Sequence, residues 1–268
     1  MASPDSYFRG KHVLITGGSS GIGLATAKKL TGMGATVTIL ARRASVLEEA
    51  KASLGERAHA LAVDVAKEAE VQEKVGAHIA AHPADMLINN AGIVMPGRFL
   101  ELESRHFREM MDVNYFGTVN MCRVVLPQLV ARGSGHVLNV SSMAGVIGVY
   151  GYTPYAASKF ALIGFSEALR GEMWPHGVRV SVCCPPDTDT PQLHFENQYK
   201  PAETKAITGS AGLMSADAVA DVMLKGMAAN TFQIVPGLTS QAITVAYRLI
   251  PGISRWVMDQ DQKKAAKK

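Results

Sequence analysis

The sequence predicts an α/β fold in which a single parallel sheet is covered by helices on both faces. Two observations support this class: short apolar segments alternate with longer stretches of helical periodicity, and the first apolar segment ends in a glycine-rich turn. Strands that are joined through helices run parallel, so five or six such repeats form one sheet. The chain has 268 residues, of which 47% are hydrophobic and 19% are charged. We expect residues 1–268 to form a single domain with a full-sized core.

The first apolar segment, residues 12–16, is predicted to be a buried strand, and residues 24–33 a helix. Between them the glycines follow the spacing G-x-x-x-G-x-G, which differs from the common G-x-G-x-x-G. Backbone N–H groups in such a turn, together with a helix N-terminus, can bind a pyrophosphate. The turn therefore predicts a dinucleotide site, whose candidate contacts are Gly17, Ser19, Ser20, Gly21 and Ile22.

The second predicted strand, residues 35–40, ends at Ala41-Arg42-Arg43. An NAD site is expected to carry Asp or Glu here to bind the ribose 2′-hydroxyl, and neither is present. A guanidinium instead binds a 2′-phosphate through charge-assisted hydrogen bonds. The alternative, a basic helix N-terminus, is opposed by the helix dipole. We therefore expect NADPH/NADP+ as the cofactor, with Arg42 as the main contact and Ser19 or Ser20 assisting.

Polar residues follow the next two predicted strands. Residues 58–63 end at Asp64-Val65, where the carboxylate can accept a hydrogen bond from the adenine amino group. Asp64 can also cap the helix predicted over residues 67–81, and the two roles are compatible. Residues 85–88 lead to Asn89-Asn90, whose buried amides need partners and can serve both the structure and the cofactor. Asp64, Val65 and Asn90 are therefore candidate cofactor contacts.

The next segments carry the candidate catalytic residues. Helices predicted over residues 104–112 and 113–131 precede a strand over 135–142, a helix over 154–174 and a strand over 178–184. Tyr155 and Lys159 lie four apart, on one face of the helix that Pro154 begins. An ammonium near a phenol lowers the phenol's pKa, so Tyr155 can exchange a proton with a substrate oxygen, to which Ser142 offers a hydroxyl. The alternative is a surface Tyr and Lys on an ordinary helix.

Four motifs together resemble the classical short-chain dehydrogenase/reductases: Thr16-Gly-Gly-Ser-Ser-Gly-Ile-Gly, Asn89-Asn-Ala-Gly, Asn139-Val-Ser-Ser and Tyr155-x-x-x-Lys159. The resemblance covers residues 8–235. It implies one doubly wound Rossmann domain with the strand order 3-2-1-4-5-6-7. It also implies that Ser142, Tyr155 and Lys159 are catalytic, that Tyr155 and Lys159 contact the cofactor, and that Asn114 supports a water relay to the lysine.

The loop after residue 184 departs from this family. The family usually has Pro-Gly and then a threonine that closes over the nicotinamide, which implies cofactor contacts at Pro185 and Thr188, whereas Pro186 replaces the glycine here. The string Pro185-Pro-Asp-Thr-Asp-Thr-Pro191, with Glu196-Asn197 and Lys200-Pro201-x-Glu203-Thr204 downstream, is similar to the corresponding loop of 3-ketodihydrosphingosine reductases. This similarity covers residues 183–205. The resemblance therefore implies reduction of a hydrophobic long-chain 3-keto lipid, 3-ketosphinganine, to sphinganine. Alternatives are a steroid, retinoid or 3-oxoacyl reductase, or a non-catalytic NADP-binding scaffold or sensor, which the complete set of four catalytic residues disfavours.

The last third of the chain has weaker patterns. Residues 186–213 are predicted to be a substrate lid, Ser215 to cap a helix and residues 231–235 to be the last strand. Residues 239–268 form an apolar and basic extension that Arg248 and Pro251 interrupt, which disfavours a transmembrane helix. This extension can lie in a membrane interface, on its own domain or on a neighbouring subunit, and we expect a homo-oligomer.

Composition limits the remaining partners. Of the formal net charge of +4, most belongs to the chain end, so we expect no nucleic-acid partner. The eight His residues lack ligand-like spacing, so no metal site is expected. The three cysteines do not form a disulfide framework, and the N-terminus lacks an apolar signal segment, which favours a cytoplasmic location, with peripheral membrane contact as the open question. The basic residues at the end are Arg255, Lys263, Lys264, Lys267 and Lys268, against Asp259 and Asp261.

Overall fold

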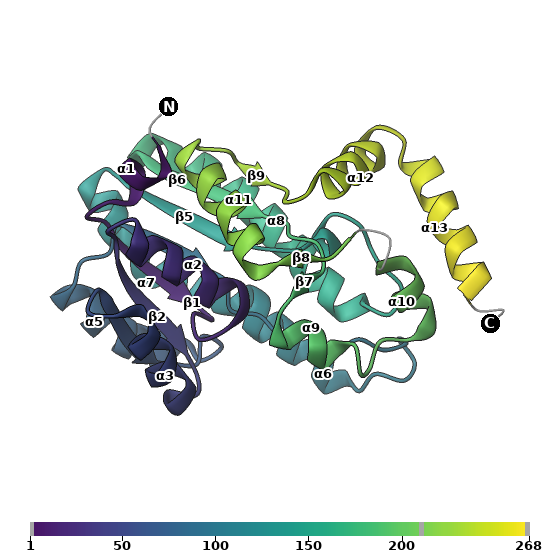
Figure 1. Cartoon of the computed structure of the whole chain (residues 1–268), viewed down its shortest axis with the longest axis horizontal. Helices are drawn as coiled ribbons and strands as arrows, with labels where there is room; N and C mark the ends of the chain where they lie inside the picture. The colour runs from purple at the N-terminus through teal and green to yellow at the C-terminus, as the bar shows by residue number, and fades with distance from the viewer. Residues whose placement is uncertain (1–2, 209–211, 266–268) are drawn as a thin grey trace.

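The computed structural model, which describes residues 3–208 and 212–265, contains a seven-stranded parallel sheet in the order β3-β2-β1-β4-β5-β6-β9 (Figure 1). The predicted order is confirmed, and its seventh strand is β9. The strands are β1 (His12–Thr16), β2 (Thr36–Ala41), β3 (Ala58–Ala62), β4 (Met86–Asn89), β5 (Gly135–Val140), β6 (Val178–Cys183) and β9 (Gln233–Ile234). A separate parallel pair is formed by β7 (Thr188–Asp189) and β8 (Met214–Ser215).

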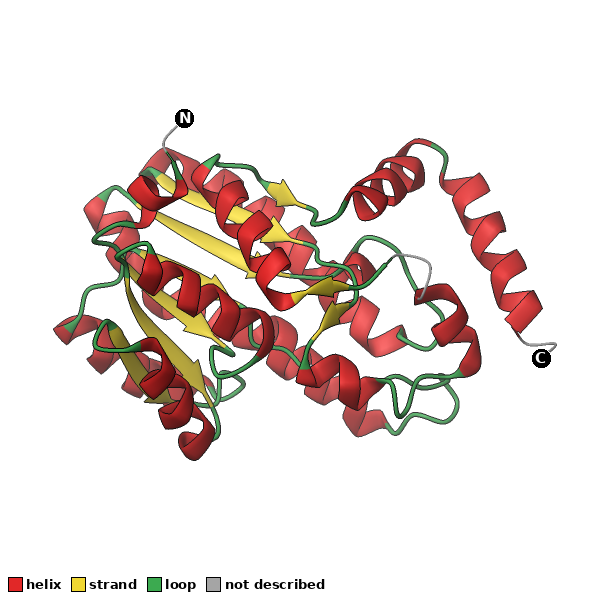
Figure 2. Ribbon diagram, viewed as in Figure 1, coloured by secondary structure: helices red, strands yellow, loops and turns green. Residues whose placement is uncertain are grey.

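Helices connect the strands and cover both faces of the sheet (Figure 2). They are α1 (Pro4–Phe8), α2 (Gly21–Gly32), α3 (Ala44–Leu54), α4 (Glu68–Glu70), α5 (Gly76–Ala81), α6 (Ser104–Met110), α7 (Gly117–Arg132), α8 (Thr153–Met173), α9 (Pro191–Glu196), α10 (Ala202–Thr208), α11 (Ala216–Ala228), α12 (Leu238–Leu249) and α13 (Pro251–Ala265). Short 3-10 turns, η3 (Met143–Gly145) and η4 (Trp174–His176), flank α8.

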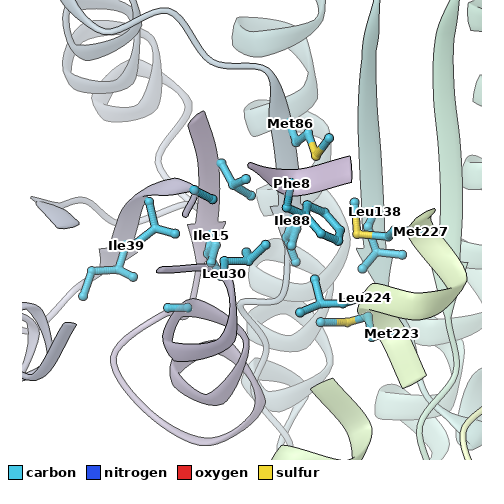
Figure 3. Packing of buried hydrophobic residues seen from close by; sticks show 14 of the residues in the cluster. Phe8, Ile15, Leu30, Ile39, Met86, Ile88, Leu138, Met223, Leu224 and Met227 are labelled. Carbon is cyan, nitrogen blue, oxygen red and sulfur yellow. The ribbon is translucent and has the colours of Figure 1, made fainter. Parts of the chain in front are cut away.

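The core lies in two layers because successive strand residues point to opposite faces. In β1, Val13 and Ile15 join the cluster that also contains Leu30 of α2 and Leu224 of α11, whereas Leu14 joins the cluster on the other face. Figure 3 shows Leu30 beside Ile15, and Leu224 beside Met223 in the same layer. The strands are thereby fixed between apolar layers, and their carboxyl ends are held at one edge of the sheet.

Two predicted helical regions contain wider π-helical turns. η1 (Val71–Val75) lies between α4 and α5, and η2 (Met111–Phe116) joins α6 to α7, so residues 104–132 form one continuous helical run rather than two helices. Such turns are frequent at functional sites. Asn114, which lies in η2, is fully buried.

The last third of the chain is more regular than its sequence pattern predicted. Residues 192–213 contain most of α9 and all of α10, and Thr190 caps α9 by accepting a hydrogen bond from Leu193 N at 3.3 Å. Ser215 caps α11 as predicted, since its Oγ accepts from Ala218 N at 3.1 Å. The helices α12 and α13 extend away from the sheet, and α13 contacts α10 (Figure 1). Within the described ranges, no helix has the length and apolar character needed to cross a bilayer.

Four histidines that are scattered in the sequence meet at the edge where β1 begins. The rings of His59 and His82 stack with centroids 4.8 Å apart, and Thr38 Oγ1 lies 2.8 Å from both His12 Nε2 and His78 Nε2. Burial lowers the pKa of His12, His59 and His78, with the neighbouring rings contributing. In the part of the chain that the structure describes, no group of three or more His, Cys, Asp or Glu residues is arranged to hold a metal.

Candidate active site

Two adjoining cavities lie at the carboxyl ends of the strands. The larger, of about 580 Å³, is lined by the glycine-rich turn, the ends of β4, β5 and β6, the start of α8, and parts of α9, α12 and α13. The smaller, of about 380 Å³, is lined by residues that follow β2 and β3. Gly17, Ser19, Ala91 and Gly92 line both cavities. The pair therefore forms a continuous trough along the edge of the sheet.

The glycine-rich turn has no room for a side chain at Gly17 or at Gly23. Gly17 has φ +66°, and a Cβ there would lie 2.9 Å from Asn90 Nδ2; a Cβ on Gly23 would lie 2.3 Å from Gly17 O. Asn90 braces the turn by donating from Nδ2 to Thr16 O at 3.1 Å and to Gly17 O at 3.2 Å. The predicted structural role of Asn90 is thus present, and the N-terminus of α2 at Gly21 faces the larger cavity.

Arg42, Asp64 and Val65 line the smaller cavity, as does Arg43, the residue before α3. The prediction that Asp64 caps the following helix is wrong. The helix begins three residues later than the cap position requires, at Glu68, and Asp64 Oδ1 instead accepts a hydrogen bond from Ala66 N at 3.1 Å. This local turn leaves Asp64 in the cavity wall.

The trough fits a dinucleotide. The N-terminus of α2 lies in the wall of the larger cavity, where its backbone N–H groups can bind a pyrophosphate, and Arg42 lies in the wall of the smaller cavity. The candidate contacts Gly17, Ser19, Ser20, Gly21, Ile22 and Asn90 line the larger cavity, as do Tyr155, Lys159, Pro185 and Thr188.

Ser142, Tyr155 and Lys159 meet in the larger cavity. Ser142 lies two residues beyond the end of β5, where its Oγ caps η3 by accepting from Ala144 N at 3.1 Å. Pro154 lies in the first turn of α8, as predicted, so Tyr155 and Lys159 share a helical face. Lys159 is 4% exposed and donates from Nζ to Val140 O at 3.0 Å.

The electrostatics of this pair differ from the prediction. Burial raises the pKa of Tyr155, Glu196 and Asp187 raise it further, and a hydrogen bond with Ser142 acts in the opposite direction. The prediction that Lys159 lowers this pKa is wrong in the structure, because its Nζ is directed at Val140 O and burial dominates. Burial also lowers the pKa of Lys159 to about 8. Tyr155 is consequently protonated at neutral pH, the state that a proton donor requires.

Asn114 is held beside this group by the π-helical turn. Its Oδ1 accepts from Ile93 N at 2.8 Å, and its Nδ2 donates to Ile93 O at 3.0 Å and to Ser158 Oγ at 2.9 Å. A Cβ on Gly92 would lie 3.3 Å from both Asn114 Oδ1 and Lys159 Nζ. Glycine at this position keeps the space between the two polar groups open.

The loop after β6 closes one side of the cavity. Pro185 O accepts a hydrogen bond from Met143 N at 2.9 Å, and Thr188 Oγ1 donates to Pro186 O at 2.9 Å. These two carbonyl groups tie the loop to η3 on one side and to β7 on the other. Thr188 is 7% exposed, so this loop is packed tightly into the cavity wall.

Three further residues of the wall were not predicted as site residues: Tyr152, Asp187 and Glu196. The Tyr152 hydroxyl donates to Glu196 Oε2 at 3.1 Å. Lys200 Nζ lies 3.1 Å from Asp187 Oδ2 and 3.3 Å from Glu196 Oε1. The sequence contained one indication, the Glu and Lys four residues apart within the lid, which are neighbours once the segment coils.

The C-terminal helices complete the apolar wall. Ile243 packs against the buried cluster that contains Val146 and Ile147. Ile250, Ile253 and Val257 also line the cavity, although they are 47%, 59% and 45% exposed. The opposite face carries exposed apolar side chains, with Leu249 75% exposed, Trp256 62% and Val245 54%. Of the basic residues predicted here, Lys267 and Lys268 lie outside the described residues, as does the side chain of Lys264.

The comparisons agree with this geometry. Residues 11–200 match the family model for short chain dehydrogenases. A 3-dehydrosphinganine reductase of Danio rerio is 42% identical over 238 residues, which cover 83% of this chain and 70% of that protein. A 3-ketodihydrosphingosine reductase of Bos taurus is 39% identical with the same coverage.

Among solved structures, a short chain dehydrogenase from Burkholderia cenocepacia in complex with NADP superposes with a TM-score of 0.81 and 25% identity, covering 94% of this chain and 98% of that one. The sheet order, the glycine-rich turn and the matched family model agree on one assignment. The chain belongs to the short-chain dehydrogenase/reductase family and is an oxidoreductase that acts on a ketone or hydroxyl group with a nicotinamide dinucleotide cofactor.

Proposed function

We propose that this chain uses NADPH to reduce a long-chain 3-keto lipid, 3-ketosphinganine, to sphinganine. The observation that carries the proposal is the larger cavity, whose lining combines the polar groups of Ser142 and Tyr155 with apolar residues of α12 and α13. A small polar head and a long apolar tail match this division. The relatives named 3-dehydrosphinganine reductase support the same substrate class.

The roles of the catalytic residues follow from their positions. The bound cofactor supplies a hydride to the carbonyl carbon. Tyr155 donates its phenolic proton to the carbonyl oxygen, and Ser142 stabilises the developing charge on that oxygen by a hydrogen bond. The Lys159 ammonium binds the nicotinamide ribose. Asn114 keeps the space beside Lys159 polar, which allows a water relay to return a proton toward Tyr155.

The cofactor preference is assigned to the end of β2. Arg42 binds the 2′-phosphate, assisted by Ser19 or Ser20, while Asp64 and Val65 contact the adenine in the smaller cavity. The strand end carries no carboxylate for a 2′-hydroxyl. This arrangement favours NADPH over NADH.

The test is NADPH oxidation by the purified full chain with three ketones: 3-ketosphinganine, a steroid ketone and an acetoacetyl thioester. The proposal expects kcat/KM to be highest for 3-ketosphinganine, because each buried CH₂ of its alkyl chain contributes about 0.8 kcal/mol. A preference for the steroid or the thioester would assign the chain to another substrate within the family. No turnover of any ketone would support a scaffold or sensor.

The domain organisation belongs to the same proposal. Residues 1–268 act as one dinucleotide-binding unit, and residues 186–213 act as the substrate lid. Leu193, Glu196 and Ile207 of this segment line the cavity, whereas residues 209–211 lie outside the described part. A lid over this end excludes water from the reacting carbonyl. The predicted homo-oligomer and the cytoplasmic location stay predictions.

The outward face of α12 and α13 is assigned to peripheral contact with an anionic bilayer. Leu249 and Trp256 are exposed there, and Arg248, Arg255 and Lys263 supply positive charge on the same two helices. Basic residues near an anionic surface contribute about 1 kcal/mol each. A substrate with a long alkyl chain resides in membranes, so this surface would bring the cavity close to it.

Cosedimentation with anionic liposomes tests the membrane contact. The wild type is expected to sediment at low salt and to dissociate as salt rises. A variant with Leu249→Ser and Trp256→Ser is expected to stay in the supernatant, whereas Leu100→Ser, which removes a 93% exposed leucine elsewhere, should sediment like the wild type. Equal sedimentation of all three proteins, or none by the wild type, would contradict the contact.

A further inference from the structure

Three charged side chains form a compact group in the wall of the larger cavity: Asp187, Glu196 and Lys200, hereafter the charged triad. Lys200 Nζ lies 3.1 Å from Asp187 Oδ2 and 3.3 Å from Glu196 Oε1, and the Lys200 side chain is 1% exposed. Glu196 is 7% exposed. Charged groups are rarely buried to this extent without a partner or a function.

The charged triad presents its negative side to the cavity. Asp187 and Glu196 line the cavity, whereas Lys200 lies behind them, with its Nζ 5.9 Å from the centre of the Tyr152 ring. When ionised, two carboxylates face one ammonium, so one negative charge is left without a counterion. The next cation in this region, Arg98, is already paired with Glu101 and with Glu203, at 3.2 Å each. The other charged residue that lines the cavity is Lys159.

The charged triad lies next to the reaction centre. The Tyr152 hydroxyl donates to Glu196 Oε2 at 3.1 Å, and the Tyr152 ring lies 5.5 Å from that of Tyr155. The charges of Glu196 and Asp187 also reach Tyr155, since both raise its pKa. A ketone that accepts a proton from Tyr155 therefore binds in the cavity whose wall carries both carboxylates.

We propose that Asp187 and Glu196 bind a primary ammonium carried on the carbon next to the ketone, so that the site selects 2-amino ketones over plain ketones. The Asp187 side chain is 29% exposed, so it is accessible from the cavity. An ammonium has three donors and compensates the unpaired negative charge, whereas an amine-free ketone leaves that charge without a partner. Tyr152 and Lys200 hold the two carboxylates in place. The identity of the alkyl chain rests on the proposed function, but recognition of the ammonium does not.

The first experiment measures selectivity with the full chain and NADPH. The probes are 3-ketosphinganine and its deaminated analogue, which has hydrogen in place of the amine. The kcat/KM of the wild type is expected to be about 10-fold higher for 3-ketosphinganine than for the deaminated analogue, because a hydrogen bond to a charged group contributes about that much. Glu196→Gln and Asp187→Asn should each lower this preference about 10-fold, with turnover of the analogue changed much less. The matched control Asp189→Asn alters a carboxylate of the same loop that pairs with His194 at 2.8 Å, and it should keep the preference.

The second experiment uses inhibitors and does not depend on 3-ketosphinganine. Dodecylammonium and dodecanol compete with reduction of an amine-free ketone, and the ammonium should bind the wild type about 10-fold more tightly. Loss of that advantage in Glu196→Gln supports the inference even if 3-ketosphinganine is not a substrate, which would overturn the proposed function alone. The inference would be overturned if the wild type and both variants showed the same preference for the amine in kcat/KM and the same inhibition by dodecylammonium. If all three proteins still reduced 3-ketosphinganine, the proposed function would stand.

Discussion

The cofactor end and the substrate end of this molecule are built differently. At the cofactor end, the turn after β1 follows a strand whose five residues are all buried, and Asn90 holds its backbone. At the substrate end, α12 buries only Ser240 and Thr244 among its residues and exposes Leu238 by 83%. Segments with few buried apolar contacts open more readily than core strands. The cofactor, which the whole family uses, thus binds against the rigid sheet. The substrate is selected by helices that lie outside the sheet.

The largest effect is expected where the two ends meet, at Tyr155. Tyr155→Phe removes the proton donor and keeps the ring, so turnover should fall by about 10²–10⁴-fold while NADPH still binds at the rigid end. The measurements are kcat for a hydrophobic ketone and the Kd for NADPH. Turnover within tenfold of the wild type would contradict the role of Tyr155, and loss of NADPH binding would show that the two ends are not separable.

The second effect belongs to the cofactor end alone. Arg42→Asp should lower the ratio of kcat/KM for NADPH over NADH by about 10²-fold, because attraction to the 2′-phosphate is replaced by repulsion. Arg43→Asp, at the neighbouring residue in the same cavity wall, is the matched comparison. An unchanged ratio in Arg42→Asp with a changed ratio in Arg43→Asp would move the 2′-phosphate contact to Arg43.

The same difference explains what was predictable from the sequence. The parallel sheet and the glycine-rich turn depend on local patterns, such as strands buried on both faces and a turn that needs φ +66° at Gly17. The resemblance also brought Ser142, Tyr155 and Lys159 into one site. These features depend on short stretches of the chain, so periodicity and motif spacing were enough to predict them.

Features that depend on contacts between distant segments were missed. The pKa of Tyr155 is set by burial and by charges from the loop after β6 and from α9, so its pairing with Lys159 predicted the wrong direction. The charged triad and the cavity-lining residues of α12 and α13 likewise belong to no sequence motif. The histidine cluster joins His12 to His59, His78 and His82, and only the fold reveals it.

The third effect is confined to the apolar wall at the substrate end. Ile253→Ser combined with Val257→Ser makes the wall polar and should lower kcat/KM for a long-chain ketone about 10-fold, with a short-chain ketone little affected. Both residues line the cavity, whereas Trp256 between them is not among the lining residues. Trp256→Ser is therefore the matched control and should keep the dependence on chain length in detergent solution. An equal loss for short and long chains would contradict a tail-binding wall.

The smallest effect concerns the sheet itself and leaves the substrate end untouched. Burial, with help from Arg179, lowers the pKa of His136 in β5 to about 3, and burial beside three other histidines lowers that of His78 to about 4. In the unfolded chain a histidine titrates near ~6.5. Below that pH the unfolded state binds protons that the folded state does not. The free energy of unfolding should therefore be highest above pH about 6.5 and should decrease as the pH drops toward about 4.

Urea unfolding at pH 7.5 and 5.5 measures this fall, which is at most about 1.4 kcal/mol per pH unit for each such histidine. Glu196 changes the stability in the opposite direction with pH, because burial raises its pKa. The contribution of a histidine is therefore measured by comparing the pH dependence of a variant with that of the wild type. His136→Gln removes one titrating ring from between Tyr7 and Ser181, and it should lower stability at pH 7.5 but flatten the dependence on pH. His176→Gln, an exposed histidine, is the control and should keep the wild-type slope. If His136→Gln kept the full slope, the acid sensitivity would have to come from the histidine cluster at the start of β1, because that cluster holds the other strongly lowered histidine.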